Sequence, residues 1–200
     1  MASQPPPEKQ LWILVGGNGA GKSTFYREAL RSTGLPFVNA DVIARQRFPQ
    51  APEAHSYQAA ALARQLRDIL IRQGQSFCYE TVFSHPSKID FIADAKAGDY
   101  QVILVFIHLG DPQLNQARVH QRTEEGGHQV PADKIRARLP RTFRHVRLAL
   151  PLCDQAHLID NSSAEVPLLR VGHVEAGQYT PLTNVQPDWV DTLLFGQEKD

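Results

Sequence analysis

The sequence predicts an α/β domain in which a parallel sheet of five strands is flanked by helices. Short apolar runs alternate along the chain with stretches of helical character, which is the pattern of a parallel sheet with right-handed crossovers. Residues 102–107 are apolar throughout, as in a central strand that is buried on both faces. A glycine-rich turn at residues 16–23 joins the first apolar run to the first helix.

Glycine and proline residues bound most of the predicted elements. The strands are expected at residues 11–15, 36–40, 76–81, 100–107 and 156–159. The helices are expected at residues 23–31, 53–73, 86–97, 112–123 and 131–149, with a short helix or loop at 41–48. The expected apolar stripe of helix 53–73 consists of Ala60, Ala61, Leu62, Leu66, Ile69 and Leu70. Residues 168–174 and 178–182 are compatible with a small hairpin, and residues 187–195 with a closing helix.

The composition fits one domain behind a short leader. A length of 200 residues is that of a single domain with a sizeable core. Residues 1–10 contain three consecutive prolines and no apolar h-region, so we expect a disordered leader rather than a signal peptide, followed by a single domain over residues 11–200. The 21 basic and 21 acidic side chains cancel, which argues against nucleic acid as a partner.

The compartment is predicted from cysteine usage and hydropathy. Two cysteines are too few for a disulfide framework and indicate reduced thiols in a cytosolic protein. The longest strongly apolar run, residues 102–107, is far short of a membrane span. The eight histidines are scattered without metal-ligand spacing. We therefore expect a cytoplasmic protein with no membrane partner.

The turn at residues 16–23 fits the P-loop pattern G-x-x-x-x-G-K-[ST]. Its glycines let backbone N–H groups approach phosphates at a helix N-terminus. Lys22 is expected to reach the terminal phosphates and the Ser23 hydroxyl to bind Mg²⁺. The pattern predicts ATP and Mg²⁺ as cofactors. The predicted nucleotide-binding residues of the loop are Gly17, Asn18, Gly19, Ala20, Gly21, Lys22, Ser23 and Thr24.

Polar side chains follow the other predicted strands, and carboxyl ends of parallel strands share one edge of a sheet. Asp41 follows the second strand and is placed to accept a proton from an attacking hydroxyl. The alternative is that Asp41 caps a helix. Glu80 and Thr81 end the third strand and are expected to contact the acceptor substrate, with Glu80 also able to hold Mg²⁺ through water. A structural ion pair with an arginine is the alternative for Glu80.

A basic segment at about residues 118–147 is the third feature. It holds eight basic residues against three acidic ones in a chain of zero net charge. Two glycines near its middle permit a turn between two basic helices. We expect a lid that brings arginines over a phosphoryl group and excludes water, and the alternative is a solvated basic face. The arginines predicted to act are Arg118, Arg122, Arg136 and Arg141.

Two other P-loop classes are excluded by motifs that the chain lacks. Transporter-type ATPases carry an LSGGQ-like signature and an apolar strand that ends in adjacent Asp and Glu, and neither occurs here. A GTPase would carry an N-K-x-D motif to read the base, which is also absent.

The ordered set of motifs over residues 11–162 resembles the zeta-toxin-like P-loop kinases, in particular a short bacterial branch of predicted ATPases. The motifs that carry the resemblance are residues 16–24, Asn39-Ala40-Asp41, Tyr79-Glu80-Thr81, Arg122 with the stretch Glu-Gly-Gly-His-Gln-Val-Pro at 125–131, and Ile135-Arg136.

The resemblance implies an adenylate-kinase-like fold with a lid. It implies transfer of the ATP γ-phosphate to a hydroxyl, in the studied toxins that of UDP-N-acetylglucosamine, and a separately encoded antitoxin partner. In this family Lys22 corresponds to the phosphate lysine, Asp41 to the general base and Glu80 to the substrate carboxylate. Arg122, Arg136 and Arg141 correspond to lid arginines, and Arg118 to the arginine that stacks on adenine. Asn161 lies where such kinases hold the base.

Two other functions stay open at this stage. A nucleotide-dependent regulatory ATPase or switch would use lid closure to present a surface to a partner. A nucleic-acid 5′-hydroxyl kinase would share the architecture, although no wider basic track supports it.

Overall fold

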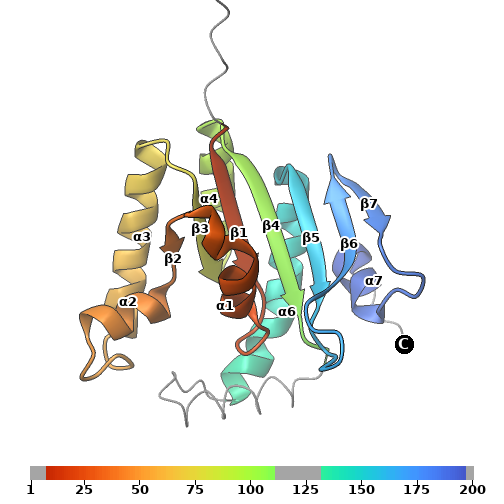
Figure 1. Ribbon diagram of the computed structural model, residues 1–200, viewed down its shortest axis with the longest axis horizontal. Helices are drawn as coiled ribbons and strands as arrows, with labels where there is room; N and C mark the ends of the chain where they lie inside the picture. The colour runs from red at the N-terminus through yellow and green to blue at the C-terminus, as the bar shows by residue number, and fades with distance from the viewer. Residues whose placement is uncertain (1–7, 111–131, 197–200) are drawn as a thin grey trace, which may run out of the picture.

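The computed structural model describes residues 8–110 and 132–196, in which one twisted sheet carries helices on both faces (Figure 1). The strand order is β2-β3-β1-β4-β5-β6-β7. The strands are β1 (Gln10–Val15), β2 (Phe37–Val38), β3 (Phe77–Thr81), β4 (Gln101–His108), β5 (Gln155–Asp160), β6 (Leu169–Glu175) and β7 (Gln178–Pro181). The first five in this order pair in parallel, which confirms the predicted α/β class and its parallel sheet.

The predicted number of strands was wrong, because the C-terminal hairpin joins the sheet. β6 pairs antiparallel with β5, and β7 pairs antiparallel with β6. The hairpin had been expected as a separate small element. Its addition covers the edge of β5, which would otherwise expose unpaired backbone groups. The described sheet is therefore mixed and has seven strands.

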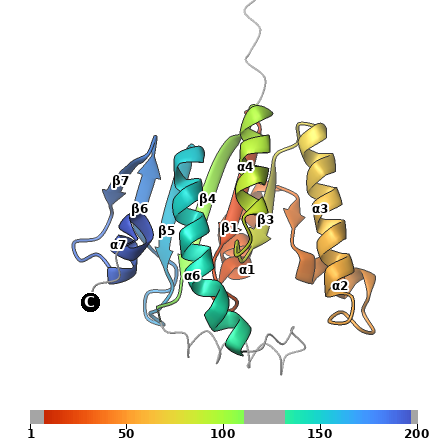
Figure 2. The same cartoon turned by 180° about the vertical axis from the view of Figure 1, so that it is seen from behind.

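The helices lie where the periodicity predicted them, with shifts of a few residues at their ends. They are α1 (Lys22–Phe25), continued by a π turn (Tyr26–Leu30) and a 3₁₀ turn (Arg31–Thr33), then α2 (Ala40–Arg47), α3 (Ser56–Arg72), α4 (Ser87–Ala97), α6 (Ala132–Ala149) and α7 (Asp188–Phe195). Figure 2 shows α4 and α6 across the back of the sheet, with α3 beyond the β2 edge. The helix predicted at 112–123 lies outside the described residues. None of the described helices has the length and apolar composition needed to cross a bilayer.

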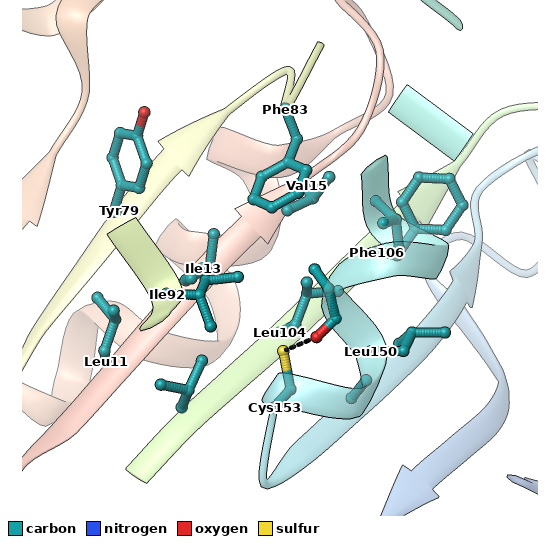
Figure 3. Packing of buried hydrophobic residues seen from close by; sticks show 14 of the residues in the cluster. Leu11, Ile13, Val15, Tyr79, Phe83, Ile92, Leu104, Phe106, Leu150 and Cys153 are labelled. Atoms are coloured by element: carbon teal, nitrogen blue, oxygen red, sulfur yellow. Dashed lines mark hydrogen bonds between the residues drawn. The ribbon is translucent and has the colours of Figure 1, made fainter. Parts of the chain in front are cut away.

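The core is divided between the two faces of the sheet. On the back, Ile13 and Leu104 from the central strands pack with Phe83 and Ile92, which lie after β3 and on α4 (Figure 3). On the front, Leu14, Val105 and Ile107 pack beneath α1 and the turn that follows it. Alternate residues of β1 and β4 are thus buried on opposite faces, which explains why residues 102–107 are apolar without alternation.

The apolar stripe predicted for α3 was wrong except at Leu70. Leu62, Leu66 and Ile69 are 37–41% exposed, whereas the buried residues are Ala59, Ala63, Arg67 and Leu70. The small side chains of Ala59 and Ala63 let α3 lie close to α2 and β2. The larger residues consequently face outward, and an arginine occupies a position on the buried side.

One carboxylate ties the back helix α4 to the beginning of β4. The Nζ of Lys96 donates to both carboxylate oxygens of Asp154, at 2.6 and 2.7 Å, and the backbone N–H of Val102 donates at 2.7 Å. Burial alone would raise the pKa of Asp154, but these hydrogen bonds outweigh it and hold the pKa below its usual value. The folded state therefore favours the ionised carboxylate.

We expect Asp154→Asn to lower the free energy of unfolding by about 1 kcal/mol near pH 7. A depressed pKa stabilises the fold above the unfolded value and loses this contribution as pH falls through the folded pKa, so the loss should shrink below about pH 4. Urea unfolding at several pH values measures it, with the exposed Asp90→Asn as control. An equal loss at pH 2.5 and pH 7 would show that the charge is not responsible.

Candidate functional site

The loop at residues 16–23 is seated directly on the carboxyl ends of β4 and β5. Gly16 and Gly21 have φ angles of 153° and 102°. A Cβ on Gly16 would lie 2.2 Å from the carbonyl oxygen of Ile107, and one on Gly21 would lie 2.5 Å from Nδ2 of Asn161. Glycine is therefore required at both positions by conformation and by space.

Lys22 begins α1 and is only 6% exposed. Its Nζ donates to the carbonyl oxygens of Gly16 at 2.9 Å and Gly17 at 2.8 Å, and it lies 3.9 Å from Oε1 of Glu80. These contacts fix the ammonium inside the curve of the loop. A cation in this place, beneath backbone N–H groups at a helix N-terminus, suits a bound phosphate.

Ser23, in the first turn of α1, meets Glu80 at the end of β3, which is the strand beside β1. Leu14 pairs with Glu80 in register, so both strands end at the same level of the sheet. The Ser23 hydroxyl donates to Oε2 of Glu80 at 2.7 Å, and the Glu80 side chain is 11% exposed. The alternative of an arginine partner for Glu80 is wrong within the described residues, since its cation is Lys22. A hydroxyl and a carboxylate in contact are oxygen ligands of the kind that Mg²⁺ takes, so these residues fit the predicted metal.

Asp41 lies in the first turn of α2, just past the end of β2. The capping alternative for Asp41 is wrong, because Asn39 caps this helix. Oδ1 of the buried Asn39 accepts the N–H groups of Asp41 at 2.7 Å and Val42 at 3.2 Å. Asn and Asp are both good N-cap residues, so the sequence alone does not tell whether the helix begins after Asn39 or after Asp41. The half-buried Asp41 carboxylate makes no hydrogen bond or ion pair with a described residue.

Thr81 shapes the turn that follows β3. Its hydroxyl oxygen accepts the backbone N–H of Phe83 at 3.1 Å, and Phe83 takes a left-handed φ of 64°. This contact is structural, and the predicted contact of Thr81 with a substrate stays a prediction.

Asn161 holds the loop from the opposite side. Its Nδ2 donates to the carbonyl oxygen of Ala20 at 2.9 Å, and its Oδ1 accepts the N–H of Leu168 at 3.1 Å. Its own N–H donates to the carbonyl oxygen of His108 at 2.8 Å. Both polar atoms of this buried side chain are used within the protein, so its role here is to hold the loop. Contact with the nucleotide base stays a prediction.

The buried His108 and the half-buried Asp160 lie side by side near the loop, and this pairing was not predicted by the sequence analysis. The two residues are register partners at the ends of β4 and β5, which is the signal that could have found them. Trp189 donates to Asp160 at 2.7 Å and its ring lies 4.8 Å from that of His108. Burial lowers the pKa of His108 to about 4, although Asp160 opposes this. His108 is therefore neutral near pH 7, and its ring packs against that of Trp189.

The predicted lid falls largely outside the described residues. Arg118 and Arg122 lie there, and of Arg136 only the backbone, in α6, is described. Arg141 is exposed, and its Nε donates to the carbonyl oxygen of Ala137 at 3.1 Å. From the fully buried Thr142 onward, α6 packs on the sheet, with the Thr142 hydroxyl donating to the carbonyl oxygen of Val82 at 2.9 Å. The lid and its arginines stay predictions.

A model of the family described as AAA domain matches residues 11–144, which include the loop, Asp41, Glu80 and the beginning of α6. The chain belongs to this AAA-domain family. An uncharacterized protein of Haemophilus influenzae is 31% identical over 140 residues, which cover 65% of this chain and 97% of the relative. The relative is therefore a shorter protein than this chain.

Solved structures confirm the fold. The crystal structure of AvrRxo1-ORF1:-ORF2 with ATP matches with a TM-score of 0.73 and 16% identity, covering 96% of this chain and 65% of the other. The chain thus spans less than two thirds of that protein. The PezAT toxin–antitoxin system of Streptococcus pneumoniae matches with a TM-score of 0.66 and 15% identity, covering 98% and 82%. The predicted likeness to zeta-toxin-like P-loop proteins is thereby confirmed for the fold.

We expect Asn161→Ala to weaken ATP binding by about tenfold while the protein still folds. The substitution removes the bond to Ala20, and one lost hydrogen bond of this kind corresponds to about 1.4 kcal/mol. Isothermal titration with an ATP analogue and Mg²⁺ measures it, and the exposed Asn184→Ala is the control. Unchanged affinity in Asn161→Ala would mean that the loop keeps its shape without this tie.

Proposed function

We propose that this protein is an ATP- and Mg²⁺-dependent kinase that transfers the γ-phosphate to a hydroxyl of a small metabolite. The observation that supports this most is the Asp41 carboxylate. It has no structural partner among the described residues, and it follows β2 at the same sheet edge as the P-loop. An unengaged carboxylate near a γ-phosphate suits a general base for an alcohol acceptor.

In this proposal each described residue has a separate task. The loop N–H groups and Lys22 hold the phosphates, and Ser23 with Glu80 holds Mg²⁺, which when bound neutralises charge on the transferred group. Asp41 takes the proton of the acceptor hydroxyl as its oxygen bonds to the γ-phosphorus and the bond to the ADP oxygen breaks. Arg122, Arg136 and Arg141 would neutralise negative charge on the transferred phosphoryl group from the side of the lid. Arg118 would stack on adenine.

The acceptor and the partner are proposed from the relatives. A nucleotide sugar such as UDP-N-acetylglucosamine is the acceptor that the zeta-toxin resemblance favours. PezAT is a toxin–antitoxin system and AvrRxo1-ORF1 forms a complex with ORF2. By analogy we propose a separately encoded protein antitoxin for this chain and a cytoplasmic site of action.

We expect Lys22→Ala to abolish phosphoryl transfer and Asp41→Asn to reduce kcat by at least about 10²-fold without changing ATP affinity. A metabolite extract is incubated with protein and ATP, and mass spectrometry identifies the metabolite that becomes phosphorylated. The kinetics of each variant are then measured with the unphosphorylated metabolite as substrate. The exposed Asp90→Asn is the matched control and should keep full activity.

Three outcomes would redirect the proposal. Full turnover by Asp41→Asn would show that Asp41 is not the general base. Capture of a protein partner that needs ATP, with no phosphorylated metabolite, would indicate a nucleotide-dependent switch. Labelling of a 5′-hydroxyl oligonucleotide in preference to every metabolite would indicate a nucleic-acid kinase.

A further inference from the structure

Arg67 is a buried cation without an anionic partner in the part of the chain that the structure describes. It lies on α3 and is 6% exposed. Its Nε is fully enclosed and has no hydrogen-bond partner. Among the described residues, no carboxylate forms an ion pair with Arg67. A buried charge normally has a counter-charge, because removing it from water is costly.

Aromatic rings hold this guanidinium in place, and a second cation lies over one of the same rings. Its Cζ lies 4.0 Å from the ring centroid of Tyr79 and 4.8 Å from that of Phe91. The Nζ of Lys88 lies 5.7 Å from the same Tyr79 ring. Cation–π contacts contribute roughly 0.5–2 kcal/mol each, which offsets only part of the desolvation of one cation and leaves two like charges on one ring.

The Tyr79 ring, which both cations contact, is next along β3 to a residue of the proposed reaction centre. Tyr79 directly precedes Glu80 on β3, and its register partner is Val38 on β2, three residues before Asp41. Lys88 is near the beginning of α4, which follows the carboxyl end of β3. Figure 2 shows β3 between α3 and α4. The ring that both cations contact therefore belongs to the strand that supplies Glu80, and it pairs with the strand that leads to Asp41.

We propose that Arg67 and Lys88 bind an anionic group, a phosphate or carboxylate, of the phosphoryl acceptor. Stacking on Tyr79 fixes the guanidinium plane, so its terminal nitrogens are oriented before the anion arrives. This inference rests on the proposed kinase function and narrows it. The acceptor is a hydroxyl compound that carries negative charge, such as a sugar phosphate or a nucleotide sugar, and not a neutral sugar.

The first test measures binding alone. In protein saturated with AMP-PNP and Mg²⁺, so that the P-loop is filled, equilibrium dialysis with radiolabelled inorganic phosphate should detect a second anion site. Arg67→Met and Lys88→Met should each weaken this site by at least about tenfold, the size of one lost charge-assisted hydrogen bond. The exposed Arg64→Met, one turn earlier on α3, should bind phosphate as the wild type does.

Thermal unfolding separates this role from a purely structural one. Phosphate should raise the Tm of the nucleotide-saturated wild type and of Arg64→Met but not of Arg67→Met. An Arg67→Met protein that binds phosphate like the wild type would overturn the proposal. If Arg67→Met does not fold, unchanged phosphate affinity in the half-buried Lys88→Met would overturn it.

Kinetics connect the site to the acceptor. Phosphate should compete with the acceptor, raising KM with kcat unchanged, and UDP-N-acetylglucosamine should be used at least tenfold more efficiently than N-acetylglucosamine. Equal kcat/KM for the charged and neutral compounds, or phosphate inhibition that does not compete with the acceptor, would overturn the assignment. Phosphate binding that requires Arg67, without any phosphorylated product, would support the anion site and overturn the kinase function.

Discussion

The contact of Glu80 with Ser23 and Lys22 is the constraint on which the rest of the site depends. One carboxylate balances a buried ammonium and accepts a hydrogen bond from a hydroxyl, and it does so from a strand that must be in register with β1. A slip of one residue in that pairing would turn Glu80 to the back of the sheet, where the core is apolar. The contacts of Glu80 with Ser23 and Lys22 therefore form only when β3 pairs with β1 in the observed register.

Charges at the sheet edge are divided between its two faces. Glu80 points to the front toward the P-loop, while Tyr79, its neighbour in sequence, carries the cations Arg67 and Lys88 at the back. The strand alternation thus places Glu80 and the Tyr79 ring that carries the cations on opposite faces, although the two residues are adjacent in the chain. Glu80 therefore pairs with Lys22 and not with Arg67 or Lys88.

Much of this organisation was readable from the residues. Glycine spacing and apolar runs gave the P-loop and the five parallel strands, because backbone conformation and burial demand those residue types. The pairing of the C-terminal hairpin with β5 could not be predicted, because the residue pattern of 168–182 does not determine which strand the hairpin pairs with. Arg67 was missed because the stripe of α3 was chosen by side-chain size. The small Ala59 and Ala63, which lie eight and four residues before it, mark the buried side. Asn39 and Asp41 are both chemically suited to cap α2, so the residue types alone do not show which of them does.

The tie between Ala20 and Asn161 joins residues 141 positions apart. The motif at the beginning of the chain is complete in sequence after residue 24, but its loop acquires its last support only when β5 has been added to the sheet. On the ribosome this happens only after residue 161 has been synthesised. The nascent chain therefore contains the complete P-loop motif long before the residue that supports its loop. The final shape of the loop depends on the folding of a distant part of the chain.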